Sequence, residues 1–195
     1  MTDVVAVTDG QRVVIGADSA AISDREIHIR ATPKVFRNGP YAVGFTTSWR
    51  MGQILNHLVE LPEPPRRLDD EQLERFMVTE VIETIRDAFT RHGFVKTARV
   101  ALSSEITVEG QAMGGAFLIG IDGCIFEIRE DFQVVRPGRR FAAVGAGAVL
   151  SLGALRALER LPDLSLEERT LAALEAAQDY SPAVRAPFRL VSTPE

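Results

Sequence analysis

The sequence predicts an α+β fold in which two antiparallel sheets pack face to face with helices outside each of them, a four-layer α-β-β-α sandwich. Short β-branched runs separated by turn residues indicate antiparallel hairpins. The helical patterns occur in two pairs, in the order strands, two helices, strands, two helices and a final strand. Because each sheet must cover its outer apolar face, we expect one helix pair over each sheet.

Length and composition favour a single water-soluble domain over residues 1–195. The chain has 195 residues, of which 46% are apolar and 25% charged, and a net charge of -5. This charge argues against nucleic-acid binding, which needs a basic surface. No run approaches the roughly 20 apolar residues that cross a bilayer, and the start of the chain does not resemble a secretory signal. We therefore expect a cytoplasmic protein with neither a membrane nor a nucleic-acid partner.

The first strands form a hairpin. Residues 3–8 and 12–17 are two apolar, β-branched runs, and Asp9 and Gly10 between them supply the turn. Both runs are almost continuously apolar, which is typical of strands covered on both faces. Further short strands are predicted at 26–31, 34–37 and 41–46.

Two helices follow. In "SWRMGQILNHLVEL" the apolar residues recur at helical spacing, with Ser48 or Thr47 available as the N-cap, and the prolines of "PEPPRR" end this helix. A second helix is predicted over about 70–92, with an apolar residue every four positions and Gly93 as its stop.

The second half repeats this order, after a stretch over 94–112 that the pattern leaves unassigned. Asp122 and Gly123 separate two of the later strands, and the spacing from Ser165 to Glu168 predicts a capping box at the start of the last helix. The predicted strands lie at 115–122, 124–131, 132–135, 141–145 and 187–192, and the helices at 146–161 and 164–178.

Thr2 follows Met1 directly. A small second residue favours removal of the initiator methionine, which would make Thr2 the N-terminus. Such a threonine carries a nucleophilic hydroxyl and, in its own α-amino group with a pKa of about 7.7 to 8.0, a base. Taken alone, Thr2 says little, because in most chains that begin Met-Thr the threonine is an ordinary second residue.

Two charged residues at fixed spacing from Thr2 make a catalytic role for it more specific. Asp18 ends the second strand of the hairpin, sixteen positions after Thr2, and Lys34 opens a later strand, thirty-two positions after it. Because the hairpin folds back, Asp18 should lie beside Thr2. A lysine there would lower the pKa of the hydroxyl, whereas an arginine could not exchange a proton at neutral pH. The alternative is a strand-end ion pair without a catalytic role.

The segments "TDVVAVTDGQRVVIGADS", "PKVFR" and "VGFTTSWRMG" together resemble the proteasome β-subunit family and its bacterial HslV-type relatives, which are N-terminal nucleophile hydrolases. The resemblance is clearest over the first sixty or so residues, and the later order of elements is compatible with it. It implies the N-terminal nucleophile hydrolase fold, with Thr2 as nucleophile and Asp18 and Lys34 as its activating pair.

The same resemblance implies two further groups. The backbone of "GFTTS", which contains Gly44, Thr46 and Thr47, would form the oxyanion hole, with the donating N–H near Thr46 or Thr47. Ser181 would belong to the groups that complete the site.

The chain departs from the family pattern at three places. Ala146 stands in "VGAGAV" where the family has a serine, and Gln178 stands where an aspartate should precede Ser181 by three residues. Asp179 is one position off, and Asp3 replaces a second threonine. Either the site works with fewer supporting groups, or this copy has weak or no activity.

The resemblance implies a threonine-type endopeptidase that assembles into a homo-oligomeric ring and degrades peptides or unfolded proteins. No ATP-binding loop is evident, so an unfoldase would be a separate ATP-dependent protein. The alternatives are a small-molecule amidase with the same nucleophile and a catalytically impaired structural subunit. No cofactor or metal is expected, because the three histidines lack ligand spacing and there is one cysteine, Cys124.

Overall fold

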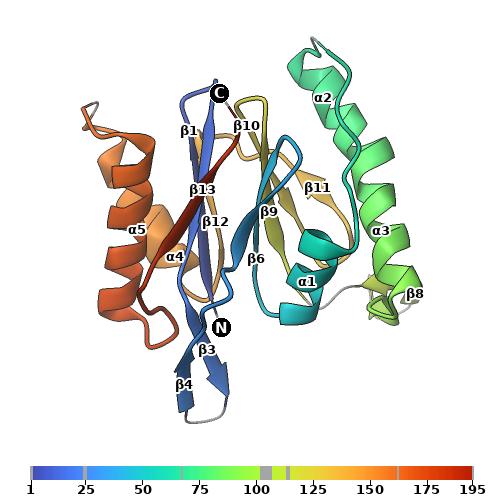
Figure 1. The fold of residues 1–195 in the computed structure, drawn as a ribbon, viewed down its shortest axis with the longest axis horizontal. Helices are drawn as coiled ribbons and strands as arrows, with labels where there is room; N and C mark the ends of the chain where they lie inside the picture. The colour runs from blue at the N-terminus through green and yellow to red at the C-terminus, as the bar shows by residue number, and fades with distance from the viewer. Residues whose placement is uncertain are drawn as a thin grey trace.

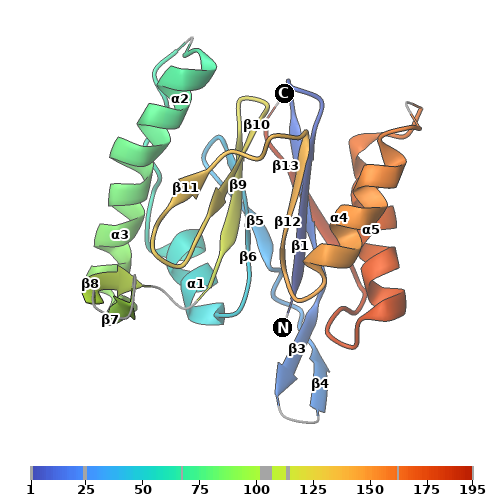
Figure 2. The same cartoon turned by 180° about the vertical axis from the view of Figure 1, so that it is seen from behind.

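A computed structural model describes residues 2–23, 26–66, 68–101, 107–112, 115–161 and 163–194. Two antiparallel sheets lie side by side in the middle of the molecule, α4 and α5 lie outside one of them, and α1, α2 and α3 lie outside the other (Figures 1 and 2). The predicted α+β class with antiparallel sheets is confirmed. No helix in the described ranges is long and apolar enough to span a membrane.

The first sheet has the strand order β12-β1-β2-β13. Its centre is the predicted first hairpin, in which Val4 pairs with Ala17 and Thr8 with Val13. Every residue of both hairpin strands is buried, as the continuous apolar runs predicted. The strands are β1 (Asp3–Thr8), β2 (Val13–Ala17), β12 (Phe141–Gly145) and β13 (Arg189–Ser192).

The second sheet has the order β11-β10-β9-β6-β5. The hairpin of β9 and β10 turns at Asp122 and Gly123, both of which have positive φ angles. The strands are β5 (Val35–Asn38), β6 (Tyr41–Phe45), β9 (Phe117–Ile121), β10 (Cys124–Ile128) and β11 (Val134–Val135).

The two sheets meet through a layer of small and β-branched side chains. At Gly44 they approach so closely that a Cβ atom would lie 2.5 Å from Val4 Cγ1 and 2.8 Å from Ile15 Cγ2. The buried residues of this layer are Val4, Ala6, Val13, Ile15, Ala17, Val35, Ala42, Leu118, Ile125, Ala142 and Val144. Close packing of β6 on β1 and β2 thus holds the second sheet against the start of the chain.

The outer face of the first sheet is covered by α4 (Ala148–Leu158) and α5 (Leu166–Tyr180). The predicted capping box is confirmed, since Ser165 accepts a hydrogen bond from the Glu168 amide and Glu168 accepts one from the Ser165 amide. Leu155 and Leu174 pack with Val5 and Val14 of the sheet.

The outer face of the second sheet is covered by α1 (Trp49–His57), α2 (Asp70–Phe76) and α3 (Ile82–Arg91). Of the two predicted N-caps of α1, Ser48 is the one used, and it accepts a hydrogen bond from the Met51 amide. The single helix predicted over 70–92 is interrupted by one π-helical stretch, Met77–Val81, between α2 and α3. Gly93 follows with φ +68°.

Two hairpins differ from the predicted elements. The strand predicted at 26–31 is β4 (Glu26–Ile29), and it pairs with a strand that was not predicted, β3 (Ala20–Ser23). This hairpin projects away from both sheets near the start of the chain (Figure 1). The unassigned stretch contains β7 (Lys96–Ala101) and β8 (Thr107–Ala112), which pair with each other.

Replacement of Gly44 tests the packing between the sheets. We expect Gly44→Ala to destabilise the protein by about 1 to 3 kcal/mol, because the added methyl overlaps buried side chains of the opposite sheet. Gly138→Ala is the matched control, since a Cβ there meets no atom within 4 Å. Urea denaturation of both variants gives the comparison, and equal stabilities would contradict this account of the interface.

Candidate active site

The start of β1 and the end of β2 meet at one edge of the first sheet, as the hairpin predicted. The Asp3 amide donates to Asp18 Oδ1 at 3.1 Å, and the Asp18 amide donates to the Asp3 carbonyl at 3.3 Å. Thr2 is buried, with 4% of its surface exposed. Asp18 therefore lies beside the first residues of the chain, where the spacing placed it.

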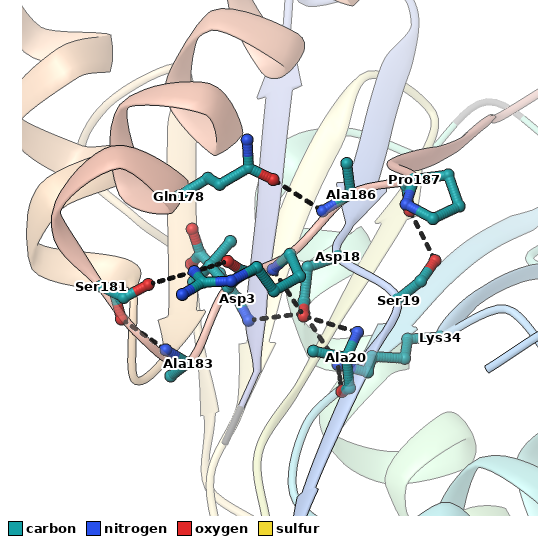
Figure 3. A network of polar contacts seen from close by, with 12 residues as sticks. Asp3, Asp18, Ser19, Ala20, Lys34, Gln178, Ser181, Ala183, Ala186 and Pro187 are labelled. Atoms are coloured by element: carbon teal, nitrogen blue, oxygen red, sulfur yellow. Dashed lines mark hydrogen bonds and ion pairs between the residues drawn. The ribbon is translucent and has the colours of Figure 1, made fainter. Parts of the chain in front are cut away.

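Lys34 reaches the same place from the segment ahead of β5. Its Nζ donates to Asp18 Oδ1 at 2.7 Å and to the Ala20 carbonyl at 2.6 Å (Figure 3). Both side chains are almost completely buried, with exposed fractions of 3% for Lys34 and 0% for Asp18. Burial lowers the pKa of Lys34, and the neighbouring Asp18 carboxylate opposes this shift.

Asp18 is also held by backbone amides. Its Oδ2 accepts from the Ala20 amide at 2.9 Å and lies 3.5 Å from the Arg185 amide. These bonds fix the carboxylate that holds Lys34, so the lysine ammonium has a defined position in spite of its long side chain.

A cavity of about 220 Å³ opens beside these residues. Thr2 and Lys34 both line it, and the Lys34 Nζ lies 6.0 Å from the centre of the Trp49 ring. The remaining lining residues are Ala20, Ala21, Ile22, His28, Arg30, Phe45 and Thr47. The cavity could hold a substrate side chain next to the Thr2 hydroxyl.

The three residues predicted for the oxyanion hole lie in different surroundings. The Thr46 amide already donates to the Ala116 carbonyl at 3.0 Å, and Gly44 is packed within β6 between Val35 and Leu118. Thr47 lines the cavity with a φ of +66°. Within the part of the chain that the structure describes, the Thr47 amide makes no hydrogen bond. Of the three residues, Thr47 is therefore the one that lines the cavity and whose amide is not used in the described fold.

Ser181 lies at the end of α5 and is not among the residues that line the cavity. Its Oγ accepts from the Ala183 amide at 3.2 Å, and its carbonyl accepts from the Arg185 guanidinium at 2.8 Å (Figure 3). Gln178, at the position of the missing aspartate, accepts from the Ala186 amide at 2.7 Å. Both side chains hold the segment after α5, whose Arg185 amide approaches Asp18.

The glycine turn after β12 touches the first residues of the chain. The Ala146 amide donates to the Thr2 carbonyl at 2.7 Å. Gly145 has φ +112°, and a Cβ at this position would overlap the Thr2 carbonyl. This turn therefore holds the backbone of Thr2 in place.

Asp3 is a buried charged residue that the pattern marked only as a departure. Its side chain is completely buried, and its Oδ1 has no hydrogen-bond partner among the residues that the structure describes. Ser151 Oγ on α4 lies 2.5 Å from Asp3 Oδ2 and 3.0 Å from the Ala173 carbonyl on α5. The Ser151 hydroxyl donates to Asp3 Oδ2 and thereby favours the ionised form of the carboxyl group.

Burial acts in the opposite direction on the titration of Asp3. It raises the pKa of Asp3 to about 6, Ser151 opposes the shift, and the Asp18 carboxylate adds to it. A sequence signal for this residue existed, because Asp3 is the one carboxylate inside the apolar run of residues 3–8.

The described residues contain no group of three or more histidine, cysteine, aspartate or glutamate side chains arranged to hold an ion. Cys124 is partly buried on β10 beside Asp70 and Arg136.

Comparison with known proteins shows that the fold of this chain is similar to that of solved structures. No protein-family model and no curated protein sequence matches the chain. Among solved structures, Thiobacillus denitrificans BPH in complex with epoxomicin is 22% identical with a TM-score of 0.75, and the match covers 98% of this chain and 97% of that one.

Two further structures show the same likeness. HslV from Trypanosoma brucei is 16% identical with a TM-score of 0.62, covering 97% of this chain and 98% of that one. The Anbu (Gly-1) mutant from Hyphomicrobium sp. strain MC1 is 17% identical with a TM-score of 0.60, covering 98% of this chain and 80% of that one. The chain therefore shares the fold of these three proteins.

Asp3 should make stability depend on pH with a definite sign. Its pKa is about 6 in the folded protein against an ordinary value of 3.8, so folding takes up a proton between these values. The contribution of Asp3 to the free energy of unfolding is fully present below pH 3.8. It is lost as the pH rises through about 6. The loss by pH 7 should be about 3 kcal/mol.

The comparison with Asp3→Asn isolates this effect from all other carboxyl groups. Between about pH 4 and 7 the unfolding free energy of the wild type should fall by about 2 kcal/mol relative to that of Asp3→Asn. Urea denaturation over this range provides the measurement, and a difference that does not vary with pH would show that Asp3 titrates normally.

Proposed function

We propose that this chain is a threonine-type peptidase of the proteasome β-subunit and HslV type, in which Thr2 is the nucleophile. The observation that carries the proposal is the buried Lys34–Asp18 ion pair at the start of β1, with Thr2 and Lys34 lining one cavity. The likeness to proteasome-related folds over nearly the whole chain supports it. In this reading residues 1–195 form a single domain, a four-layer N-terminal nucleophile hydrolase.

The proposed reaction begins with removal of Met1, which frees the α-amino group of Thr2. This amine takes the proton of the Thr2 hydroxyl as Oγ1 attacks the carbonyl carbon of a peptide bond. The buried ammonium of Lys34 lowers the pKa of the hydroxyl, and Asp18 holds Lys34 in place.

The negative oxygen of the tetrahedral intermediate would accept a hydrogen bond from the Thr47 amide. A donor of this kind is worth about 2.7 to 4 kcal/mol in the transition state. When the C–N bond breaks, the leaving amine takes the proton held by the Thr2 amine, and the acyl group remains on Oγ1 as an ester. Water then cleaves the ester and regenerates the hydroxyl.

Other groups would support this site in place of the family's side chains that this chain lacks. The Ala146 amide holds the Thr2 carbonyl, although Ala146 has no hydroxyl. Ser181 and Gln178 order the segment that brings the Arg185 amide to Asp18. We assign Ser181 this indirect role.

The substrate would be a peptide or an unfolded protein, and the chain would work in the cytoplasm as a homo-oligomeric ring served by a separate ATP-dependent unfoldase. These assignments follow from the family resemblance of the first sixty residues. The absence of a hydroxyl at Ala146 favours one competing candidate, a catalytically impaired subunit of the same assembly.

Hydrolysis of fluorogenic peptides tests the proposal. We expect Thr2→Ala to abolish cleavage and Lys34→Ala to slow it by at least about 100-fold, because both remove groups that the attack requires. Lys96→Ala is the matched control, since Lys96 is the other lysine of the chain and lies in β7.

Loss of one partner from a buried ion pair also destabilises a protein, by about 3 to 5 kcal/mol. The rates should therefore be compared at a temperature at which circular dichroism shows each variant to be folded. Folded Lys34→Ala with the wild-type rate would refute the activating role, and cleavage by Thr2→Ala would refute the nucleophile. A wild type that retains Thr2 as its N-terminus but cleaves no peptide would identify an impaired subunit.

A further inference from the structure

Asp3 places a second buried carboxyl group next to the proposed nucleophile, and the reaction above does not use it. The carboxyl lies against the first turn of α4, where a Cβ atom at Gly147 would come within 2.8 Å of Asp3 Cβ, Cγ and Oδ2. Ser151, one turn further along α4, completes its surroundings and is itself fully buried. Gly147 and Ser151 thus form a fitted site for the Asp3 side chain.

The backbone of Asp3 connects this carboxyl to the ion pair. The Asp3 amide and the Lys34 Nζ both donate to Asp18 Oδ1, at 3.1 Å and 2.7 Å. A change in the position of Asp3 can therefore move Lys34 through the shared oxygen atom of Asp18. A change in the charge of Asp3 also acts on Lys34 directly, through space.

Two charged groups act on Asp3, one at the end of β2 and one ahead of β5. Asp18 at the end of β2 disfavours its ionised form, and Lys34 ahead of β5 favours it. From α4 comes the Ser151 hydroxyl, and α5 takes part through the Ala173 carbonyl that Ser151 also contacts. The neighbouring strand β12 reads "FAAVG" and has no titratable residue.

Lys34 favours the ionised form of Asp3, and Asp3 in turn acts on Lys34. The negative charge of Asp3 raises the pKa of Lys34, against the effect of burial. Ionised Asp3 thus keeps Lys34 protonated, and it would act in the same way on the α-amino group of Thr2, which must be neutral to take a proton. Protonated Asp3 releases both groups from this influence.

We propose that Asp3 is a positioning residue that acts through Asp18 and Lys34 and sets the pH range over which the nucleophile works, with Ser151 controlling its charge. The proposal rests on the function proposed above.

The first experiment measures kcat/KM for peptide hydrolysis as a function of pH. For Asp3→Asn we expect the acidic limb to move to lower pH by about one unit, because the loss of the negative charge lowers the pKa of the amines. Ser151→Ala should move it in the same direction by less, since loss of the hydroxyl disfavours the ionised carboxylate. Asp87→Asn is the matched control, because Asp87 is exposed on α3.

The second experiment does not depend on activity. The chain has two lysines, Lys34 and Lys96, so NMR of protein with ¹³Cε-labelled lysine gives two signals, which Lys96→Arg assigns. The titration midpoint of Lys34 should fall by about one pH unit, or tenfold in its acid dissociation constant, in Asp3→Asn. Asp87→Asn should leave it unchanged.

The two experiments separate the possible failures. A Lys34 midpoint that is the same in Asp3→Asn, Ser151→Ala and wild type would overturn the proposed role of Asp3, whatever the activity. A pH profile that only decreases in height, without moving, would assign Asp3 a structural role and would also overturn it. A shifted Lys34 midpoint together with cleavage by Thr2→Ala would retain the coupling and reject the proposed nucleophile.

Discussion

The buried Asp18 carboxylate is the group on which the rest of the site depends. It accepts hydrogen bonds from Lys34 Nζ and from the Asp3 and Ala20 amides, so one side chain joins the start of β1, the end of β2 and the segment ahead of β5. Burying two charges costs several kcal/mol per ion, which the mutual attraction offsets only when the remaining lone pairs are satisfied. The amides around Asp18 meet this condition, and they explain how a lysine ammonium is held inside the protein beside Thr2.

A second set of contacts holds the first residues from the side of α4. Gly145 and Gly147 have no side chain, which lets the turn after β12 approach the backbone of Thr2 and the carboxyl of Asp3. The Ala146 amide between them donates to the Thr2 carbonyl. Both glycines are therefore explained by the close approach of this turn to the start of the chain. The position of Thr2 therefore depends on the first sheet and on the turn between β12 and α4.

Much of the fold and the activating pair could be predicted, because both depend on local patterns. A two-strand hairpin with a short turn brings its ends together, which placed Asp18 beside Thr2, and side-chain caps marked the starts of α1 and α5. The hairpin of β3 and β4 was partly missed because it projects from the sheets, and its exposed strand Glu26–Ile29 lacks a buried face that would give alternation. The choice between Thr46 and Thr47 depends on the Ala116 carbonyl, seventy positions away, which no local pattern contains.

The central claim is that the Thr2 hydroxyl is the nucleophile and that the Thr47 amide receives the negative oxygen. A crystal structure of the mature protein treated with a peptide boronate tests both parts at once. We expect the chain to begin at Thr2, a covalent bond from Thr2 Oγ1 to boron, and a boron-bound oxygen within about 3 Å of the Thr47 nitrogen. A chain that keeps Met1, or an adduct on any other residue, would contradict the account.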